Sequence, residues 1–175
     1  MEDKCSWYTE SMPSIPYHVI VLLCAVGISE LAGGIGALFT TPAIPHWYAS
    51  LRKPPGNPPN RVFGPVWTLL YFLMGIAVFL VWTSGDDPHA IQFAVIIFAV
   101  QLVVNVLWSV IFFGMKDPLA ALGIIIFLWL MIATTIAAFW FIVPLAAALL
   151  IPYFLWTSFA AYLNLGIAWL NPKNS

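Results

Sequence analysis

Two amides and an indole lie on one face of a long apolar stretch in the middle of the chain. Gln101, Asn105 and Trp108 are separated by four and three residues, so a helix places them along one narrow stripe. If this stretch crosses a membrane, amides that face lipid find no hydrogen-bond partner, and both must point toward another helix or into a cavity. The stripe therefore predicts either an interhelical clamp, worth ~1 kcal/mol per hydrogen bond, or contacts to a ligand.

Two other apolar stretches carry aromatic side chains at the same helical spacing. The first stripe contains Trp67, Tyr71 and Met74. The second contains Tyr153, Trp156, Ala160 and Asn164. Each stripe alone also suits core packing, but the three together describe a cavity with broad, flat walls and few hydrogen-bonding groups. Such a cavity suits a large, planar, apolar ligand.

Glu30 is the only carboxylate well inside an apolar stretch. An ionisable side chain within a membrane is costly enough to be a functional hypothesis by default. We interpret it either as a neutral, hydrogen-bonded acid or as a group that sets ligand polarity or couples to protons. In the same stretch, small residues follow each other at intervals of four, at Ala25, Ser29, Gly33 and Ala37. This spacing predicts the close approach of another helix, either from this chain or from a second copy.

Other chemistries find little support in the sequence. Its residues show no Ser-His-Asp or Cys-His set, no metal-ligand cluster and no phosphate-binding glycine loop at useful spacing. We therefore expect neither a metal site nor a hydrolytic active site. Cys5 lies in a polar segment and Cys24 in an apolar one, which does not suggest a disulfide. The net charge of -1 excludes the basic surface that a nucleic-acid partner requires.

The composition is that of a membrane protein. Hydrophobic residues make up 62% of the chain and charged residues 7%, and the mean hydropathy is +0.96. A helix needs about 20 residues to cross a hydrocarbon core of roughly 30 Å, and five stretches qualify, near residues 16–40, 62–84, 89–113, 118–141 and 145–170. We therefore predict an all-α membrane protein in which residues 1–175 form a single domain, a five-helix transmembrane bundle. Only the first connection, residues 41–61, is long, and we expect it to be a structured loop.

The basic residues predict how the bundle lies in the membrane. In a five-span arrangement one side carries only Lys4, and the other carries Arg52, Lys53, Arg61, Lys116 and Lys173. Basic residues are enriched in cytoplasmic loops. We therefore expect the N-terminus outside, and the long loop and the C-terminus in the cytoplasm.

Four blocks in order resemble one known family, the translocator proteins. They read "WYASLRKPPGNPP", "VFGPVWTLLYFLMG", "QLVVNVLWSVIFF" and "PYFLWTSFAAYLN". The family is also called TspO/MBR, tryptophan-rich sensory proteins or peripheral benzodiazepine receptors, and the resemblance spans residues 27 to about 165. It implies a five-helix bundle, commonly a homodimer, with a pocket for porphyrins and benzodiazepine-type ligands below a first loop that acts as a lid.

The resemblance also implies which residues form that pocket. Carried over by position, they are Tyr48, Trp67, Tyr71, Asn105, Trp108, Trp156 and Ala160. Gln101 and Tyr153, from the polar and aromatic stripes above, complete the predicted ligand-binding set, and Trp47 is expected on the underside of the lid. A porphyrin, protoporphyrin IX or haem, is the implied ligand, and no cofactor is required. In some bacterial members, tryptophans similar to Trp67 and Trp156 support light-dependent breakdown of protoporphyrin, which leaves enzymatic activity open.

Three functions remain as hypotheses from the sequence. The first is a receptor or sensor that binds tetrapyrroles and moves or degrades them. The second is a carrier of sterols or other apolar metabolites, and the third is an interaction module whose aromatic interior is only packing. The cholesterol-recognition pattern of animal members requires a basic residue soon after a tyrosine, but Tyr162 is followed by none before Lys173. The short C-terminus "NPKNS" also lacks their basic tail, so we expect a microbial cell membrane rather than a mitochondrial outer membrane.

Overall fold

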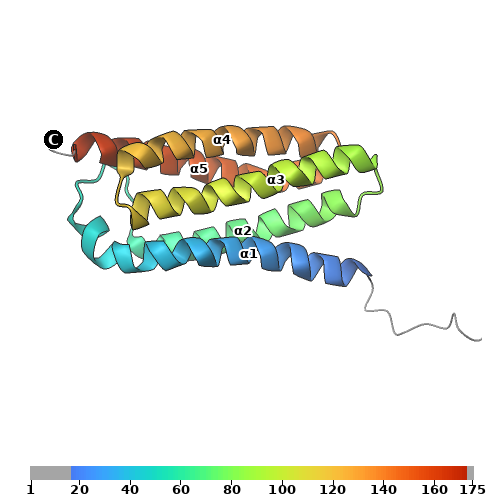
Figure 1. Ribbon diagram of the computed structural model, residues 1–175, viewed down its shortest axis with the longest axis horizontal. Coiled ribbons are helices and arrows are strands. Elements are labelled where there is room, and N and C mark those ends of the chain that lie inside the picture. Colours follow the sequence, from blue (N-terminus) through green and yellow to red (C-terminus); the bar gives the residue numbers. More distant parts are fainter. Residues whose placement is uncertain (1–16, 173–175) are drawn as a thin grey trace, which may run out of the picture.

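Five long helices lie side by side in the computed structural model, which describes residues 17–172 (Figure 1). They are α1 (Tyr17–Ala43), α2 (Asn60–Trp82), α3 (Pro88–Ser109), α4 (Pro118–Trp140) and α5 (Pro144–Leu170). Two π-helical turns extend them, η1 (Ile44–Tyr48) after α1 and η2 (Val110–Gly114) after α3. Each of the five is long and apolar enough to cross a membrane, and these residues contain no strand. The predicted fold class, an all-α bundle of five transmembrane helices, is confirmed.

The helices form a closed ring rather than a layer. The strongest contacts join α1 to α2, α2 to α5, α5 to α4, α4 to α3 and α3 back to α1. Short connections place consecutive helices antiparallel, so the first loop, the connection between η2 and α4, and the end of α5 all lie at one end of the bundle (Figure 1). We call this the loop end. The turns between α2 and α3 and between α4 and α5 lie at the opposite end.

Aspartate side chains start two of the helices. The Asp87 side chain accepts a hydrogen bond from the backbone N–H of Ala90, at 3.1 Å, and Asp117 accepts one from Ala120, at 3.2 Å. Each satisfies one of the free N–H groups at a helix start. Proline follows each aspartate as the first helical residue, where its missing N–H costs least. These caps fix the short connections that hold neighbouring helices antiparallel.

The end of the first helix differs from the sequence prediction. We expected the first helix to end near residue 40 and the loop to begin at residue 41. In the structure α1 includes Pro42, and the π-helical turn η1 accommodates Pro45 and carries the helical path on to Tyr48. Ala49 and Ser50 are also helical, so the irregular loop is residues 51–59, shorter than predicted.

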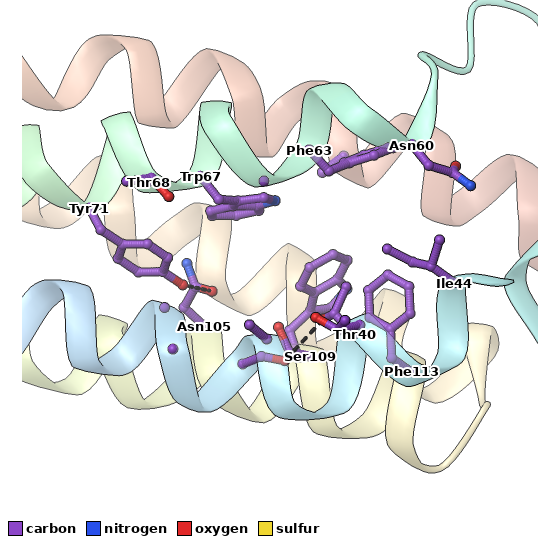
Figure 2. A pocket seen from close by; sticks show the side chains of 18 of the residues that line it. Thr40, Ile44, Asn60, Phe63, Trp67, Thr68, Tyr71, Asn105, Ser109 and Phe113 are labelled. Carbon is purple, nitrogen blue, oxygen red and sulfur yellow. Dashed lines mark hydrogen bonds between the residues drawn. The ribbon is translucent and has the colours of Figure 1, made fainter.

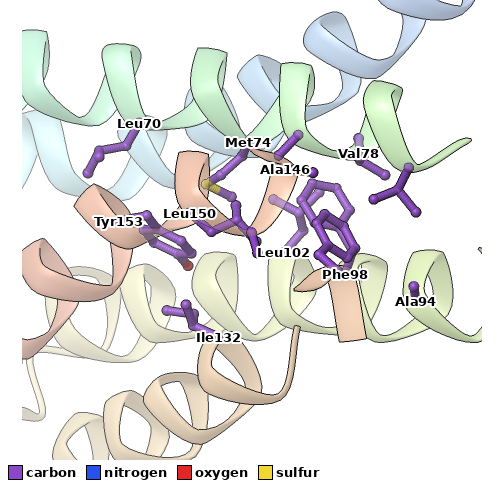
Figure 3. Packing of buried hydrophobic residues seen from close by; sticks show 14 of the residues in the cluster. Leu70, Met74, Val78, Ala94, Phe98, Leu102, Ile132, Ala146, Leu150 and Tyr153 are labelled. Atoms are coloured by element: carbon purple, nitrogen blue, oxygen red, sulfur yellow. The ribbon is translucent and has the colours of Figure 1, made fainter. Parts of the chain in front are cut away.

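The half of the bundle away from the loop end is solidly packed. Its cluster of buried side chains, drawn in Figure 3, includes Leu70, Met74, Phe98, Leu102, Ile132 and Leu150. Within the same cluster the rings of Phe98 and Phe139 stack with centroids 6.0 Å apart. Here α1 and α2 touch backbone to backbone, because a Cβ on Gly75 would lie 2.5 Å from Val26 Cα. In this half a second hollow, between α1, α2 and α3, is lined almost entirely by apolar side chains such as Ile20, Ile28 and Val95.

The loop is fastened to the last helix. The side chain of Asn171 accepts a hydrogen bond from Arg52 N–H and donates one to Arg52 C=O, both at 2.9 Å. Tyr162 on α5 donates to the carbonyl of Pro55 at 3.1 Å. A Cβ on Gly166 would lie 2.6 Å from the ring of Pro54, so only glycine lets the loop lie this close. The loop is thus a fixed cap over the loop end, as the sequence predicted in calling it structured.

Candidate functional site

A cavity of about 330 Å³ lies inside the loop half of the bundle (Figure 2). From their contact at Gly75, α1 and α2 diverge toward the loop end, where a Cβ on Gly34 or on Gly64 would meet nothing within 4 Å. Both glycines line the cavity and are exposed, as are Ala37 and Thr68. The cavity therefore opens between α1 and α2 toward the bilayer, while α3 and α5 form its back wall.

Aromatic rings line one side of the cavity. Trp67 stands at its centre, with its ring centroid 5.7 Å from that of Tyr71 and 6.3 Å from that of Trp108. The Trp108 indole is held in place because its Nε1 donates to Asn164 Oδ1 at 3.0 Å. The Asn164 amide in turn donates to the carbonyl of Pro118 at 2.7 Å. The broad aromatic surface predicted from the sequence is thus present and rigidly supported.

A chain of hydrogen bonds starts at this wall and runs into the bundle. Tyr71 donates to Asn105 Oδ1 at 3.0 Å, and Asn105 Nδ2 donates to the Tyr153 hydroxyl at 2.6 Å. Tyr153 then donates to Gln101 Oε1 at 3.0 Å. All four side chains are at most 5% exposed, so each hydrogen bond replaces one that water would have made. The chain links α2, α3 and α5 and fixes the direction of the Asn105 amide.

The predicted site residues separate into two groups. Those that line the cavity are Tyr48, Trp67, Tyr71, Asn105, Trp108, Trp156 and Ala160. Gln101 and Tyr153 do not line it, since they lie behind Asn105 in the hydrogen-bond chain. Their stripes point toward the interior, but Asn105 and Trp67 stand between them and the open space. Of the two readings of the amide stripe, the interhelical clamp therefore applies to Gln101, while Asn105 serves as both clamp and wall.

Trp47 also lies outside the cavity, contrary to the prediction from the family resemblance. Its ring contacts Phe112 edge to face, with centroids 5.6 Å apart, and Phe113 at 6.4 Å. The neighbouring Tyr48 lines the cavity instead, and its hydroxyl donates to Asn57 Oδ1 at 2.8 Å. Successive residues of a helical turn point in different directions, so only one of the two can face inward.

Sequence reasoning missed most of what α1 contributes. The cavity is lined on this helix by Glu30, Gly33, Gly34, Gly36, Ala37, Thr40 and Thr41, followed by Ile44 in η1. The spacing of small residues was read as a packing surface, and part of it is one, because a Cβ on Gly33 would lie 2.5 Å from the ring of Tyr71. A Cβ on Gly36 would lie 3.1 Å from Ser109 Oγ. The small-residue face therefore packs within this chain and also leaves the cavity open.

The cavity can supply few polar contacts to a ligand. The Trp156 Nε1 is buried and has no hydrogen-bond partner among the described residues, so it is free to donate to an acceptor on a ligand. Asn105 keeps one N–H and one oxygen lone pair beyond the two hydrogen bonds above. Within residues 17–172 no group of three His, Cys, Asp or Glu side chains could hold a metal ion. The arrangement suits a flat, apolar molecule held by ring contacts and a few hydrogen bonds.

Comparison with known proteins gives a consistent picture. The profile of the TspO/MBR family matches residues 21–170. The chain is 41% identical over 155 residues to the "Tryptophan-rich protein TspO" of Chlorobaculum tepidum, covering 89% of this chain and 98% of that protein. It is 42% identical over 154 residues to the protein of the same name from Archaeoglobus fulgidus, covering 88% and 99%. The "Translocator protein" of Bos taurus is 37% identical over 145 residues, covering 80% and 85%.

Proposed function

The chain belongs to the TspO/MBR family, and from this premise we propose that it is a membrane receptor or sensor that binds a tetrapyrrole. The ligand, of the protoporphyrin IX or haem type, occupies the cavity between α1, α2, α3 and α5. One observation carries the proposal. Indole rings from three separate helices, those of Trp67, Trp108 and Trp156, line one cavity within membrane-spanning segments, and flat aromatic walls favour stacking on a flat conjugated ligand.

The size of the cavity restricts how such a ligand sits. A volume of about 330 Å³ is at the small end of the range for ligand sites, roughly 300–1,000 Å³. A complete macrocycle is larger, so one part of it extends through the opening between α1 and α2. The exposed glycines Gly34 and Gly64 leave that path free of side chains. The apolar edge of the ring then contacts lipid, as the bilayer allows.

The test is a titration of the purified protein with protoporphyrin IX, followed by tryptophan fluorescence. We expect saturable quenching with a stoichiometry of one, because the ligand lies against Trp67 and Trp156. Trp67→Phe and Trp156→Phe each remove an indole from the wall and weaken binding several-fold. Trp169→Phe is the matched control, because Trp169 is 82% exposed and does not line the cavity. Equal affinity in all four proteins would reject the cavity as the porphyrin site.

A second candidate is a carrier of sterols or other apolar metabolites. The observation in its favour is the lateral opening between α1 and α2, since a molecule dissolved in the bilayer reaches the cavity without crossing water. Relatives such as the bovine protein carry the name "Translocator protein". Purified protein in sealed vesicles distinguishes the two functions. A carrier moves many equivalents of porphyrin or sterol per protein into the lumen, whereas a receptor takes up one equivalent and stops.

We further propose that the loop end faces the cytoplasm. Arg52 and Lys53 in the loop, Arg61 at the start of α2 and Lys116 in the connection to α4 all belong to segments at this end. The turns at the opposite end carry Asp86 and Asp87 and no basic residue other than His89 beside them. Basic residues favour the cytoplasmic side. Labelling of single cysteines placed in the loop, from either side of sealed cells, tests this orientation.

A further inference from the structure

Glu30 is an acid in the wall of the cavity and near the middle of a membrane-spanning helix. It lies on the face of α1 that also carries Gly33, Gly34 and Ala37, and all four line the cavity. Among the described lining residues it is the only carboxylate, and none of them is Lys, Arg or His. The sequence singled out Glu30 as costly, and the function proposed above makes no use of it.

No side chain in the described part of the protein neutralises this acid. Glu30 makes no hydrogen bond or ion pair there. It interacts electrostatically with Tyr71. The Tyr71 hydroxyl cannot turn to Glu30 without losing Asn105, to which it donates its only proton. A half-buried acid without a donor leaves its oxygens free to accept hydrogen bonds from whatever fills the cavity.

The two ends of the cavity differ in charge. At the loop end Lys53 Nζ lies 4.8 Å from the centroid of the Tyr48 ring, which lines the cavity from below. The Asn60 carboxamide also lines this end (Figure 2). Glu30 lies eighteen residues before Tyr48, about 27 Å away along a helix that rises about 1.5 Å per residue. A cation that does not line the cavity therefore lies beside its loop end, and the carboxylate of Glu30 lies in the wall of its deep end.

We propose that Glu30 is the residue that selects and orients the ligand, by accepting a hydrogen bond from a positively charged or N–H donor group of the ligand. Acidic or acceptor groups of the same ligand then lie at the loop end, near Lys53 and Asn60. This inference rests on the proposed function, since it concerns the same cavity. A carboxylate placed at the deep end instead would face Glu30 as a like charge in a region of low dielectric, which is unfavourable.

Three small aromatic probes of equal shape test the proposal without a macrocycle. They are 1-pyrenemethylamine, which is cationic, 1-pyrenemethanol, which is neutral, and 1-pyrenecarboxylate, which is anionic. Each is titrated into the full chain in nanodiscs of neutral lipid, with pyrene and tryptophan fluorescence as the signals. Wild-type protein should bind the amine at least tenfold more tightly than the carboxylate, because hydrogen bonds between charged groups are the stronger ones. If wild-type protein does not prefer the amine to the carboxylate, the proposal is overturned, and this comparison needs no variant.

Variants of Glu30 test whether this residue causes the preference for the amine. Glu30→Gln keeps the size and removes the charge, and should reduce amine affinity about tenfold while leaving pyrenemethanol within twofold. Glu30→Asp keeps the charge and should retain the preference for the amine, which also covers the case in which the Gln variant does not fold. Asp86→Asn is the control, because it removes an exposed acid at the opposite end and should change nothing. An Asp86→Asn effect equal to that of Glu30→Gln would mean a general charge effect and overturn the assignment.

The outcomes separate this inference from the function on which it rests. If protoporphyrin binds with the Trp67 and Trp156 dependence described above but the three pyrenes bind alike in wild type and Glu30→Gln, only the inference fails. If neither protoporphyrin nor any pyrene binds saturably, both fail.

Discussion

The hydrogen-bond chain behind the cavity wall makes a quantitative prediction about Asn105. Asn105→Leu keeps a side chain of similar size but removes the partners of Tyr71 and Tyr153. Tyr153 still donates to Gln101, whereas the Tyr71 hydroxyl, 5% exposed, has no partner left. Each interhelical hydrogen bond in a membrane protein contributes roughly 0.6 kcal/mol, and one buried unsatisfied hydroxyl costs about 1–3 kcal/mol. We therefore expect Asn105→Leu to lower the unfolding free energy by about 2–4 kcal/mol.

Removing the stranded hydroxyl should restore part of this stability. In the double variant Tyr71→Phe/Asn105→Leu no polar atom of that pair is left unpaired, so the penalty of about 1–3 kcal/mol disappears. We expect the double variant to be more stable than Asn105→Leu alone by about 1–2 kcal/mol, although it carries one more substitution. This is a coupling energy between residues in contact, and a double-mutant cycle measures it.

The assay is equilibrium unfolding of the detergent-solubilised protein, followed by circular dichroism. For a chain of this length 1 kcal/mol corresponds to a shift in Tm of about 2–4 °C. Thr134→Val is the control, because the exposed Thr134 hydroxyl donates only to the carbonyl of Leu130 in its own helix, and it should shift stability by less than about 0.5 kcal/mol. Additive effects of Tyr71→Phe and Asn105→Leu would refute the reasoning, since they would mean that the two side chains do not share a buried hydrogen bond.

Three further predictions concern glycines, the loop and the lipid-facing surface. Gly64→Ala should raise the unfolding free energy by about 0.5–1 kcal/mol, because the added Cβ would meet open space. Gly75→Ala should lower it by about 1–3 kcal/mol, because the added Cβ would clash with α1. Thermal unfolding of both variants tests whether α1 and α2 diverge between these positions. Asn171→Ala removes two hydrogen bonds to the loop and should raise the porphyrin dissociation rate several-fold in stopped-flow measurements, and an unchanged rate would mean that the loop does not limit release. Cys24 is exposed on α1, and its labelling is measured in nanodiscs with Cys5 replaced by Ser. It should react with a lipid-soluble maleimide and resist a membrane-impermeant one. Rapid labelling by the impermeant reagent would place this surface in water.

Helical spacing explains why much of the site could be predicted from sequence. The stripes through Trp67, Asn105 and Trp156 each recur every three or four residues, and a helix of known hand turns such a pattern into one face. Apolar stretches of the right length located the helices themselves. Both signals are local, because they depend only on neighbours within a few turns. They gave the correct number of spans and one pair of lining residues on each of α2, α3 and α5, but not Phe63, Thr68 or Ser109.

The remaining wall depends on contacts between distant segments. Spacing gives the direction in which Gln101 and Tyr153 point, but not that Asn105 and Trp67 stand between them and the open space. The cavity exists because α1 and α2 touch at Gly75 and then separate, and no local pattern states where two helices diverge. For the same reason, the spacing of the small residues of α1 predicted only a packing face and not a wall of the cavity. The end of that helix was misjudged because the helical path continues past Pro42 and, through the π-helical turn η1, past Pro45.

The attachment of the first loop to α5 sets an order of assembly. The groups that hold the loop, Tyr162, Gly166 and Asn171, belong to the last helix or follow it directly. A nascent chain that has inserted four spans has neither these anchors nor Trp156, and its proline-rich loop has nothing to hold it. Because synthesis runs from the N-terminus, the capped cavity is complete only when the fifth span enters the membrane. A product truncated before α5 therefore lacks both one wall of the cavity and the attachment of its loop.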